Sequence, residues 1–323
     1  MKNVSILVPR TAVPATIVNP RYLFSAVNMF FAEAGHEPFF HVDLVGEEQD
    51  IELNDGILTM HVDKLLDDVG KTDLIIIPAI SGDIQCAIDG NRILLPWIID
   101  RYKEGAEVAS LCIGAFLLAE TGLVNGRNCS THWLFANEFR RRYPDVTLVD
   151  QRMVTDQNGT YSSGGANSHW NLLMYLVEKY VGREMAITAS KFFVLDTELQ
   201  SQLPFVMFKG QKNHDDDTIR RAQEYIEDHF SEKLTVDGLA ERFATGRRTF
   251  ERRFKSATSN TVVEYIQRVK VEAAKSMLEK ARKTVAEVMY DVGYADMKAF
   301  RDLFKRITGL TPLEYKGKFV RSV

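Results

Sequence analysis

One thiol stands where a catalytic nucleophile could stand. Cys112 lies in the run VASLCIGAFLLA, residues 108–119, where a strand-like stretch passes into a helix-like one, and Gly114 follows two residues later. At such a junction the side chain at the turn projects over the edge of the sheet. The N-terminus of the following helix favours a thiolate there. The pattern fits either a nucleophile or a small residue packed at a tight junction, and the residues alone leave both open.

Two stretches near the C-terminus point to a different chemistry. Each predicts a short helix, a tight turn and a longer helix with two phenylalanines four apart, Phe250 with Phe254 and Phe300 with Phe304. This spacing places both rings on one helix face. Many other positions are basic: Arg247, Arg248, Arg252, Arg253, Lys255, then Lys298, Arg301, Lys305 and Arg306. An apolar face inward and a basic face outward suit a helix in a DNA major groove.

The thiol belongs to a segment, residues 1–190, that alternates strand and helix patterns. Apolar or mixed runs of strand length occur at Val4–Val8, Phe39–Val45, Leu74–Ile77 and Glu107–Leu111. Helices are predicted over Pro20–Gly35, Pro96–Gly105 and His169–Tyr180. Apolar strands separated by helices favour a parallel sheet covered on both faces. We therefore expect an α/β domain here.

The repeated stretches belong to a helical domain predicted over residues 215–323, after a linker over residues 191–214. Thr235, Thr284 and Asp296 are predicted helix caps, and Thr284 begins a capping box. The predicted helix Val262–Lys280 separates the repeats and spans roughly 28 Å at about 1.5 Å per residue. Two recognition helices joined in this way can lie about one DNA turn, ~34 Å, apart on one face of a duplex.

Charge is divided unevenly along the chain. The totals are 40 Lys+Arg and 44 Asp+Glu, but from Asp217 onward there are 22 Lys+Arg against 16 Asp+Glu. That leaves 18 against 28 for residues 1–216. The imbalance favours a polyanionic partner for the C-terminal part only, although ordinary solvated surfaces would give the same totals.

Several classes of protein are disfavoured by the sequence. No apolar run reaches the roughly 20 residues of a membrane span, so we expect no membrane partner. The first residues, MKNVSILVPR, predict a strand rather than a signal peptide. Three cysteines without metal-ligand spacing indicate a reducing, cytoplasmic setting, and we expect no metal and no cofactor.

The run around Cys112, the stretch Ser130-Thr131-His132-Trp133 and the stretch Ser162–Gly165 resemble the PfpI-like branch of the class I glutamine amidotransferase superfamily. The resemblance covers roughly residues 4–181 and implies a flavodoxin-like α/β sandwich. Catalytic members carry an acidic side chain on the loop after the first strand, four residues before a helix-opening proline. That proline is Pro20 here, and the matching position is Thr16, which cannot take a proton at neutral pH.

Two further departures separate this chain from the hydrolytic members. Many of them have a histidine directly after the cysteine, where this chain has Ile113, and two glycines where it has Ala79 and Ile80. His132 could serve as a base, as a ligand contact or as a structural ring. We expect no catalytic residue, and a small-molecule site formed by Thr16, Gly82, Cys112, Ile113 and His132.

The C-terminal stretch resembles the AraC/XylS-type DNA-binding domain over about residues 217–316. The second repeat carries the signature as Ala286-Glu-Val-Met-Tyr-Asp-Val-Gly293-Tyr294, the Phe300/Phe304 pair with Lys305, and Gly309-Leu-Thr-Pro312 with Tyr315. The resemblance implies DNA contacts from Arg247, Arg248, Glu251, Arg252, Lys298, Arg301, Asp302 and Lys305. The family usually has a basic residue where Asp302 stands and a Ser-like cap where Gly246 stands. We expect the first repeat to supply most of the affinity.

The two resemblances occur in the order typical of GlxA-type transcriptional regulators. That architecture implies a sequence-specific regulator of double-stranded DNA, with a small-molecule effector in front and a homodimeric assembly. The alternative is a thiol-dependent amidase or glyoxalase-like enzyme with a helical appendage. Thr16 and Ile113 weigh against the enzyme. A sensor that binds DNA without regulating it is a third possibility that the residues leave open.

Overall fold

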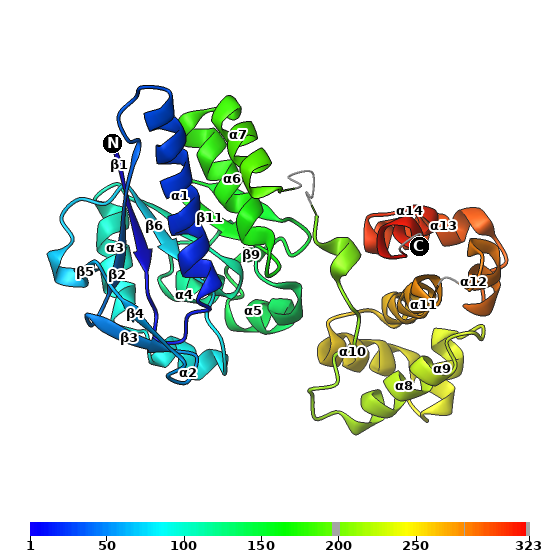
Figure 1. The fold of residues 1–323 in the computed structure, drawn as a ribbon. Coiled ribbons are helices and arrows are strands. Elements are labelled where there is room, and N and C mark those ends of the chain that lie inside the picture. The colour runs from blue at the N-terminus through cyan, green and yellow to red at the C-terminus, as the bar shows by residue number, and fades with distance from the viewer. Residues whose placement is uncertain (196–200, 281, 321–323) are drawn as a thin grey trace. The chain divides into compact units, whose positions relative to one another are not determined.

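The computed structural model describes residues 1–195, 201–280 and 282–320 (Figure 1). The chain divides into an N-terminal unit, Met1–Gln202, and a C-terminal unit, Leu203–Val323. The division falls inside the linker predicted over residues 191–214. Much of that stretch packs on one unit or the other: helix α7 extends to Phe193, and Phe208 packs against the first core of the C-terminal unit.

The N-terminal unit is built on a seven-stranded sheet with the order β10-β11-β7-β6-β1-β2-β5. Neighbouring strands are parallel except for β10 and β11, which are antiparallel. The strands are β1 Lys2–Leu7, β2 Phe40–Gly46, β5 Lys64–Leu65, β6 Leu74–Ile77, β7 Glu107–Ser110, β10 Val154–Gln157 and β11 Thr160–Ser163. Two small pairs flank it, β3 Asp50–Leu53 with β4 Leu58–His61, and β8 Asn128–Cys129 with β9 Thr147–Leu148.

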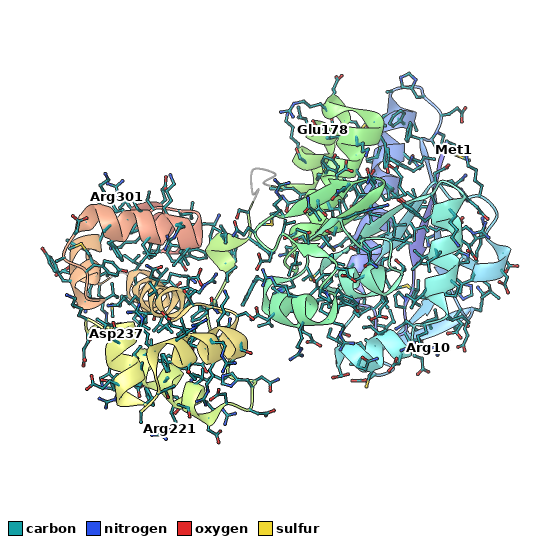
Figure 2. All side chains as sticks on the ribbon, turned by 180° about the vertical axis from the view of Figure 1, so that it is seen from behind. Met1, Arg10, Glu178, Arg221, Asp237 and Arg301 are labelled. Carbon is teal, nitrogen blue, oxygen red and sulfur yellow. The ribbon has the colours of Figure 1, made fainter. Side chains whose placement is uncertain are left out.

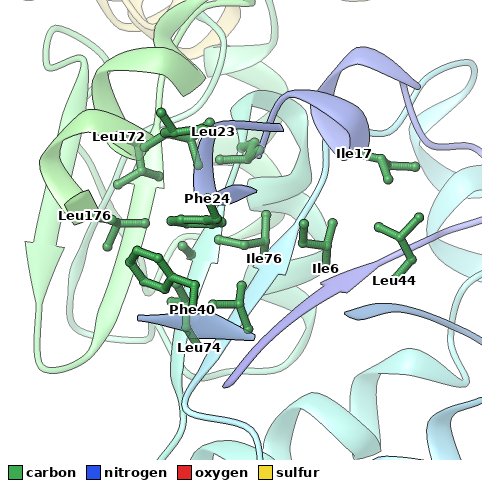
Figure 3. Close-up of a cluster of buried hydrophobic side chains, with 14 of the residues drawn as sticks. Ile6, Ile17, Leu23, Phe24, Phe40, Leu44, Leu74, Ile76, Leu172 and Leu176 are labelled. Atoms are coloured by element: carbon green, nitrogen blue, oxygen red, sulfur yellow. The ribbon is translucent and has the colours of Figure 1, made fainter. Parts of the chain in front are cut away.

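Alternate residues of each strand enter two separate cores. In β6, Leu74 and Ile76 face one core, and Ile75 and Ile77 face the other. The first core (Figure 3) is closed by helices α1 Ala15–Glu33, α6 Ser168–Val181 and α7 Arg183–Phe193. The second is closed by α2 Ile84–Asp89, α3 Leu94–Lys103, α4 Ala115–Glu120 and α5 Ala136–Arg142. The prediction of an α/β sheet covered on both faces is confirmed.

Helix α1 begins earlier than the sequence suggests. The prediction that Pro20 opens it was wrong, because the helix starts at Ala15 and contains Pro20. Proline lacks the N–H needed for an intrahelical bond and so usually marks a first turn. Here the buried stripe of the helix includes Ile17, Pro20, Phe24 and Val27, at helical spacing. Burial of Ile17 in the first core extends the helix past the proline.

The C-terminal unit contains α8 Asp217–Asp228, α9 Val236–Arg242, α10 Arg247–Thr258, α11 Val262–Glu279, α12 Val285–Asp291, α13 Met297–Thr308 and α14 Pro312–Phe319. Two cores share α11: its first half packs with α8, α9 and α10, and its second half with α12, α13 and α14. The prediction of an all-α domain with two helix–turn–helix repeats is confirmed.

Most helix starts in this unit are fixed by short side chains at the cap position. The hydroxyls of Thr235, Thr284 and Thr311 and the carboxylate of Asp296 each accept a hydrogen bond from a backbone N–H in the first turn. These bonds satisfy donors that a helix end otherwise leaves unpaired. The predicted caps at Thr235, Thr284 and Asp296 are confirmed. At α10 the cap is Gly246, which supplies no side-chain bond.

Candidate functional site

Cys112 occupies a strained turn between β7 and α4. Its φ angle is 53°, in the left-handed region that few residues other than glycine adopt, and a short 3₁₀ turn over Cys112–Gly114 follows. Gly114 lies against the end of β6, where a Cβ atom at this position would stand 2.3 Å from the carbonyl oxygen of Pro78. Only glycine allows that approach. The predicted strand–turn–helix junction is confirmed, and residues 111–114 are called the elbow below.

Neighbouring segments hold both peptide groups of Cys112. Its backbone N–H donates to Ser163 Oγ at 3.2 Å, at the end of β11. Its carbonyl oxygen accepts from Thr131 Oγ1 at 3.1 Å. The elbow is therefore held between the end of β11 and the loop that carries Thr131 and His132. The sequence motif included both stretches, but their bonds to the elbow join residues far apart in the chain.

The thiol of Cys112 is protonated at neutral pH. Its side chain is buried, and burial raises the pKa of Cys112 from 9.0 to about 12. The expectation that the helix N-terminus favours a thiolate was wrong, because the cost of burying a charge outweighs the helix dipole. Cys129 is also buried, and burial raises its pKa to about 12 as well. A thiol in this state is a poor nucleophile.

Thr16 lies in the first turn of α1 rather than on the loop before it. Its hydroxyl donates to the carbonyl oxygen of Val13 at 2.7 Å and accepts from the backbone N–H of Ala79 at 3.0 Å. The residue is buried and ties the start of α1 to the loop after β6. Where catalytic relatives are expected to carry an acid, this chain has a hydroxyl already engaged in two structural bonds.

His132 is half-buried next to the rings of Trp133 and Phe135. Its Nδ1 accepts from the backbone N–H of Leu134 at 3.1 Å and so caps a short 3₁₀ turn. Burial lowers the pKa of His132 below its ordinary value of 6.5, which keeps the ring neutral at neutral pH. Because Nδ1 acts as the acceptor in this neutral ring, the proton is on Nε2, which can donate a hydrogen bond.

Contacts link four of the five predicted ligand residues at the carboxyl ends of the strands. Thr16 bonds to Ala79 after β6, the carbonyl of Pro78 abuts the elbow that carries Cys112 and Ile113, and Thr131, next to His132, bonds to Cys112. Gly82 lies farther along the loop after β6, with a φ of 83° and open space around its Cα. The carboxyl ends of parallel strands are where ligands usually bind in such sheets.

The phenylalanine pairs hold the two long helices α10 and α13 in their cores. Phe250, Phe254, Phe300 and Phe304 have no solvent exposure, as the sequence predicts. The residues expected to contact DNA are all exposed: Arg247, Arg248, Glu251 and Arg252 on α10, and Lys298, Arg301, Asp302 and Lys305 on α13. Arg301 extends outward from α13 in Figure 2.

The two helices present matching positions with different charges. Counted from the first phenylalanine of each pair, Arg248 matches Lys298, Glu251 matches Arg301, and Arg252 matches Asp302. The first of these three positions lies three and four residues before the other two, so all three share one face of the helix. Among the described residues, Arg248, Arg252, Lys298 and Arg301 have no ion-pair partner. Their charges remain available to another molecule.

Three other basic residues have partners within the unit. Arg253 forms a two-point bond to Asp216, with its Nε at 2.8 Å and an Nη at 2.6 Å from the carboxylate. Arg306 donates to Gln267 at 2.7 Å. The expectation of an outward basic face was wrong for Arg253, which is half-buried against Asp216. Arg306 is exposed, as expected, although it bonds to Gln267 of α11. Arg247 is exposed, but its Nη1 lies 3.0 Å from a carboxylate oxygen of Asp237 and its Nε lies 3.6 Å from a carboxylate oxygen of Glu251.

Membrane-spanning helices and metal-binding clusters are both absent from the described residues. In residues 1–195, 201–280 and 282–320, no helix has the length and apolar character needed to cross a membrane. Within the same ranges, histidine, cysteine, aspartate and glutamate side chains nowhere gather in a group of three that could hold a metal ion.

Family comparisons match the two units separately. Residues 22–179 match the model of the DJ-1/PfpI family. Residues 239–318 match the model of a helix-turn-helix domain. The first range covers the elbow, His132 and the strands of the sheet other than β1, and the second begins within α9 and extends through the second repeat.

Individual proteins are similar to this chain over about two thirds of its length. The chain is 24% identical to the HTH-type transcriptional regulator ArgR of Pseudomonas aeruginosa over 67% of this chain and 66% of ArgR. It is 20% identical to the HTH-type transcriptional regulator GlxA of Rhizobium meliloti over 65% of each. The alignments thus span slightly less than two thirds of these relatives. The crystal structure of an AraC family transcriptional regulator from Pseudomonas putida superposes with a TM-score of 0.51 and 16% identity, over 60% of this chain and 100% of that chain, which shows a shared fold.

Proposed function

We propose that this chain, which joins a DJ-1/PfpI domain to an AraC-type helix-turn-helix domain, is a sequence-specific transcriptional regulator. In this proposal the N-terminal unit senses a small molecule. The observation that supports DNA binding most strongly is the pair of equivalent helices, α10 and α13. Each buries its phenylalanines and exposes a charged face. Both are held by α11, whose 18 residues span about 27 Å at 1.5 Å per residue.

Base preferences follow from the side chains at the matching positions. Arginine donates two hydrogen bonds to guanine, whereas a carboxylate accepts from the amino group of cytosine. On α10 we expect Arg248 and Arg252 to read guanine and Glu251 to read cytosine. On α13 the order changes, with Arg301 at the position of Glu251 and Asp302 at that of Arg252. The two half-sites should therefore differ in sequence.

Selection of binding sites from random duplex DNA tests this function with the purified full-length chain. We expect enrichment of two different G·C-containing half-sites whose centres lie about 10–10.5 base pairs apart. Footprinting should show both protected on one face of the duplex. Enrichment of a single half-site, or of no sequence at all, would contradict bipartite recognition. Lys280→Ala removes an exposed charge at the end of α11 and is the control for loss of one basic residue.

The elbow supports small-molecule sensing better than catalysis. Cys112 is buried with a raised pKa, and the hydroxyl of Thr16 replaces the expected acid and is engaged in two bonds. These features remove the activated nucleophile and its acid while leaving the turn intact. We infer that Cys112, Ile113, His132, Gly82 and Thr16 border a binding site. A thermal-shift screen of metabolites tests this, and thiol-dependent amide or aldehyde turnover lost in Cys112→Ser would instead support the enzyme.

A homodimer is supported by exposed apolar side chains on one face of the N-terminal unit. Val18, Tyr22 and Met29 on α1 and Ile187 and Phe192 on α7 are exposed, and α1 and α7 are in contact through the rings of Tyr22 and Phe193 at 5.1 Å. Contiguous exposed apolar surface commonly marks an interaction site. Light scattering of the full chain should give twice the monomer mass at micromolar concentration. Ile187→Asp should halve that mass, whereas Ile93→Asp, an equally exposed isoleucine on the opposite side of the sheet, should not.

A further inference from the structure

The last residue of the N-terminal unit is buried next to the elbow. Gln202 has only 1% of its surface exposed, and the next residue, Leu203, begins the C-terminal unit. Glutamine is rarely buried to this degree without a specific set of partners. The place where the chain leaves the sheet is therefore fixed by a side chain.

Hydrogen bonds hold Gln202 at both its backbone and its side chain. The Nε2 group donates to the carbonyl oxygen of Thr131 at 3.1 Å and to that of Asp150. The backbone N–H donates to the carbonyl oxygen of Gln151 at 3.1 Å, and Ser201 Oγ donates to the same oxygen at 3.0 Å. The Oε1 atom is buried and has no partner among the described residues.

A glycine makes room for this side chain. A Cβ atom on Gly164 would lie 2.8 Å from Nε2 and 2.9 Å from Cδ of Gln202, closer than any real contact of that kind. At the next position, Gly165, a Cβ would lie 3.6 Å from Oε1, an ordinary contact distance. Neither glycine has a positive φ, so alanine is compatible with the backbone at both positions.

The partners of Gln202 are the same segments that hold the elbow. Thr131 accepts from Gln202 through its carbonyl oxygen and donates through its hydroxyl to the carbonyl of Cys112. Ser163, whose hydroxyl accepts from the N–H of Cys112, directly precedes Gly164. A displacement of either segment by a molecule bound at the elbow would alter the site that holds the Gln202 carboxamide.

We propose that Gln202 is a positioning residue that links the state of the elbow to the C-terminal unit, and this proposal rests on the proposed function. With the carboxamide in place, the chain leaves the N-terminal unit from one fixed point next to Thr131 and Gly164. When an effector shifts those segments, the carboxamide is released and the C-terminal unit is freed from that point. The unpaired Oε1 makes release easier, because a buried acceptor without a donor weakens the bound state.

Two substitutions take the Gln202 carboxamide out of its site in different ways. Gln202→Ala removes the carboxamide, and Gly164→Ala displaces it through the Cβ contact. Each has a matched control, because Gln151→Ala truncates an exposed glutamine in the segment that Gln202 contacts, and Gly165→Ala adds a Cβ with room to spare. The double variant Gln202→Ala/Gly164→Ala completes a cycle, since the added Cβ no longer meets a side chain there.

Two measurements on the full-length variants test the proposal. Hydrogen exchange at the amide of residue 202 reports release directly, and we expect it to be about fivefold faster in Gln202→Ala and in Gly164→Ala, the effect of losing one net hydrogen bond. Affinity for DNA selected with the wild-type chain should change in the same direction and to a similar degree in both variants, with the double variant no different from Gln202→Ala. The two controls should match the wild type in both measurements.

Distinct outcomes separate this proposal from the proposed function. Unchanged exchange at residue 202 in both Gln202→Ala and Gly164→Ala would overturn the anchoring role, whatever the DNA result. Faster exchange with unchanged DNA affinity would show a structural anchor without a link to the C-terminal unit, and so would overturn the proposal while DNA binding stands. If the wild-type chain selects no DNA sequence, the proposed function fails, and with it the linkage, whereas the exchange measurement still decides whether Gln202 anchors the chain.

Discussion

Arg252 and Asp302 occupy equivalent positions on the two recognition helices and carry opposite charges. DNA presents phosphates on either side of each groove, so a carboxylate at this position is repelled unless it meets a donor on a base. The first repeat has three basic side chains around Phe250 at the outward positions, of which Arg247 is partly neutralised by Asp237. The two repeats are therefore unequal at the level of single side chains.

Substitutions at these positions should have unequal effects on DNA binding. We expect Arg252→Ala to weaken binding to a selected site by about tenfold or more, the effect of losing a bidentate contact to guanine. Lys298→Ala should weaken it less, because lysine acts mainly as a point charge near phosphate. Gel shifts at a fixed salt concentration measure both. A larger loss for Lys298→Ala than for Arg252→Ala would contradict the unequal roles.

Buried thiols should make the fold sensitive to alkaline pH. The pKa values of Cys112 and Cys129 rise from 9.0 to about 12 in the folded chain because both are buried. A raised pKa of an acid means that folding favours its protonated form, so this stability is complete below pH 9 and is lost as the pH rises toward 12. Denaturant unfolding between pH 8 and pH 11 should show a smaller loss in Cys112→Ala than in the wild type. The pKa of the exposed Cys86 is raised by a hydrogen bond to Asp83 rather than by burial, so Cys86→Ala should reduce the loss less than Cys112→Ala does.

At the scale of elements, the elbow depends on how closely α4 approaches the end of β6. The Cα of Gly114 lies so near the carbonyl of Pro78 that any side chain must push the two elements apart. The same contact brings Cys112 between Ser163 and Thr131. The close packing of α4 against the end of β6 therefore fixes the turn at Cys112, whatever the reactivity of the thiol.

Gly114→Ala should destabilise the N-terminal unit by about 3 kcal/mol, at the upper end of the cost of overpacking a tight site. The contact at 2.3 Å is to backbone, which cannot rotate away as a side chain can. Unfolding followed by tryptophan fluorescence measures the loss. Gly70→Ala is the control, because no atom lies within 4 Å of a Cβ at that position and its φ is not positive. Equal stability of the two variants would show that the elbow tolerates a wider turn.

Local patterns predicted some of these elements and not others. The paired phenylalanines, the caps at Thr235, Thr284 and Asp296 and the strand–turn–helix around Cys112 were predictable, because each depends on residues a few positions apart. The extension of α1 past Pro20, the raised pKa of Cys112 and the burial of Gln202 were not. Each depends on residues distant in sequence, such as Ala79 against Thr16 or Gly164 against Gln202.

At the scale of the whole C-terminal unit, α11 sets the distance between the two recognition helices. It packs into both cores, and its buried Lys270 donates to the carbonyl of Glu232, at 3.2 Å, in the loop before α9, and to that of Val292, at 2.8 Å, at the end of α12. The two halves of the unit are thus held together by packing and by the Lys270 side chain, which bonds to a segment of each. This is a rigid arrangement rather than two modules on a flexible tether.

A rigid spacing makes a strict demand on the DNA. Inserting five base pairs between the half-sites turns one of them to the opposite face of the duplex, and we expect binding to fall to that of a single half-site. Inserting a full turn restores the face but adds ~34 Å, which α11 cannot span, so binding should stay equally weak. Gel shifts on the two inserted sites measure this. Recovery with the full-turn insertion would indicate a flexible connection between the repeats.

The division of α11 between two cores also has a consequence for folding. Val262–Val269 belong to the first core and Val271–Leu278 to the second, so neither core can form unless the same helix is formed. Melting of one repeat would leave the half of α11 that packs with it without partners, and the apolar side chains of that half would be exposed. The C-terminal unit should therefore unfold in one cooperative transition. If the chain binds DNA as proposed, the unit is either able to contact both halves of its site or is unfolded throughout, and partly folded forms that occupy a single half-site do not accumulate.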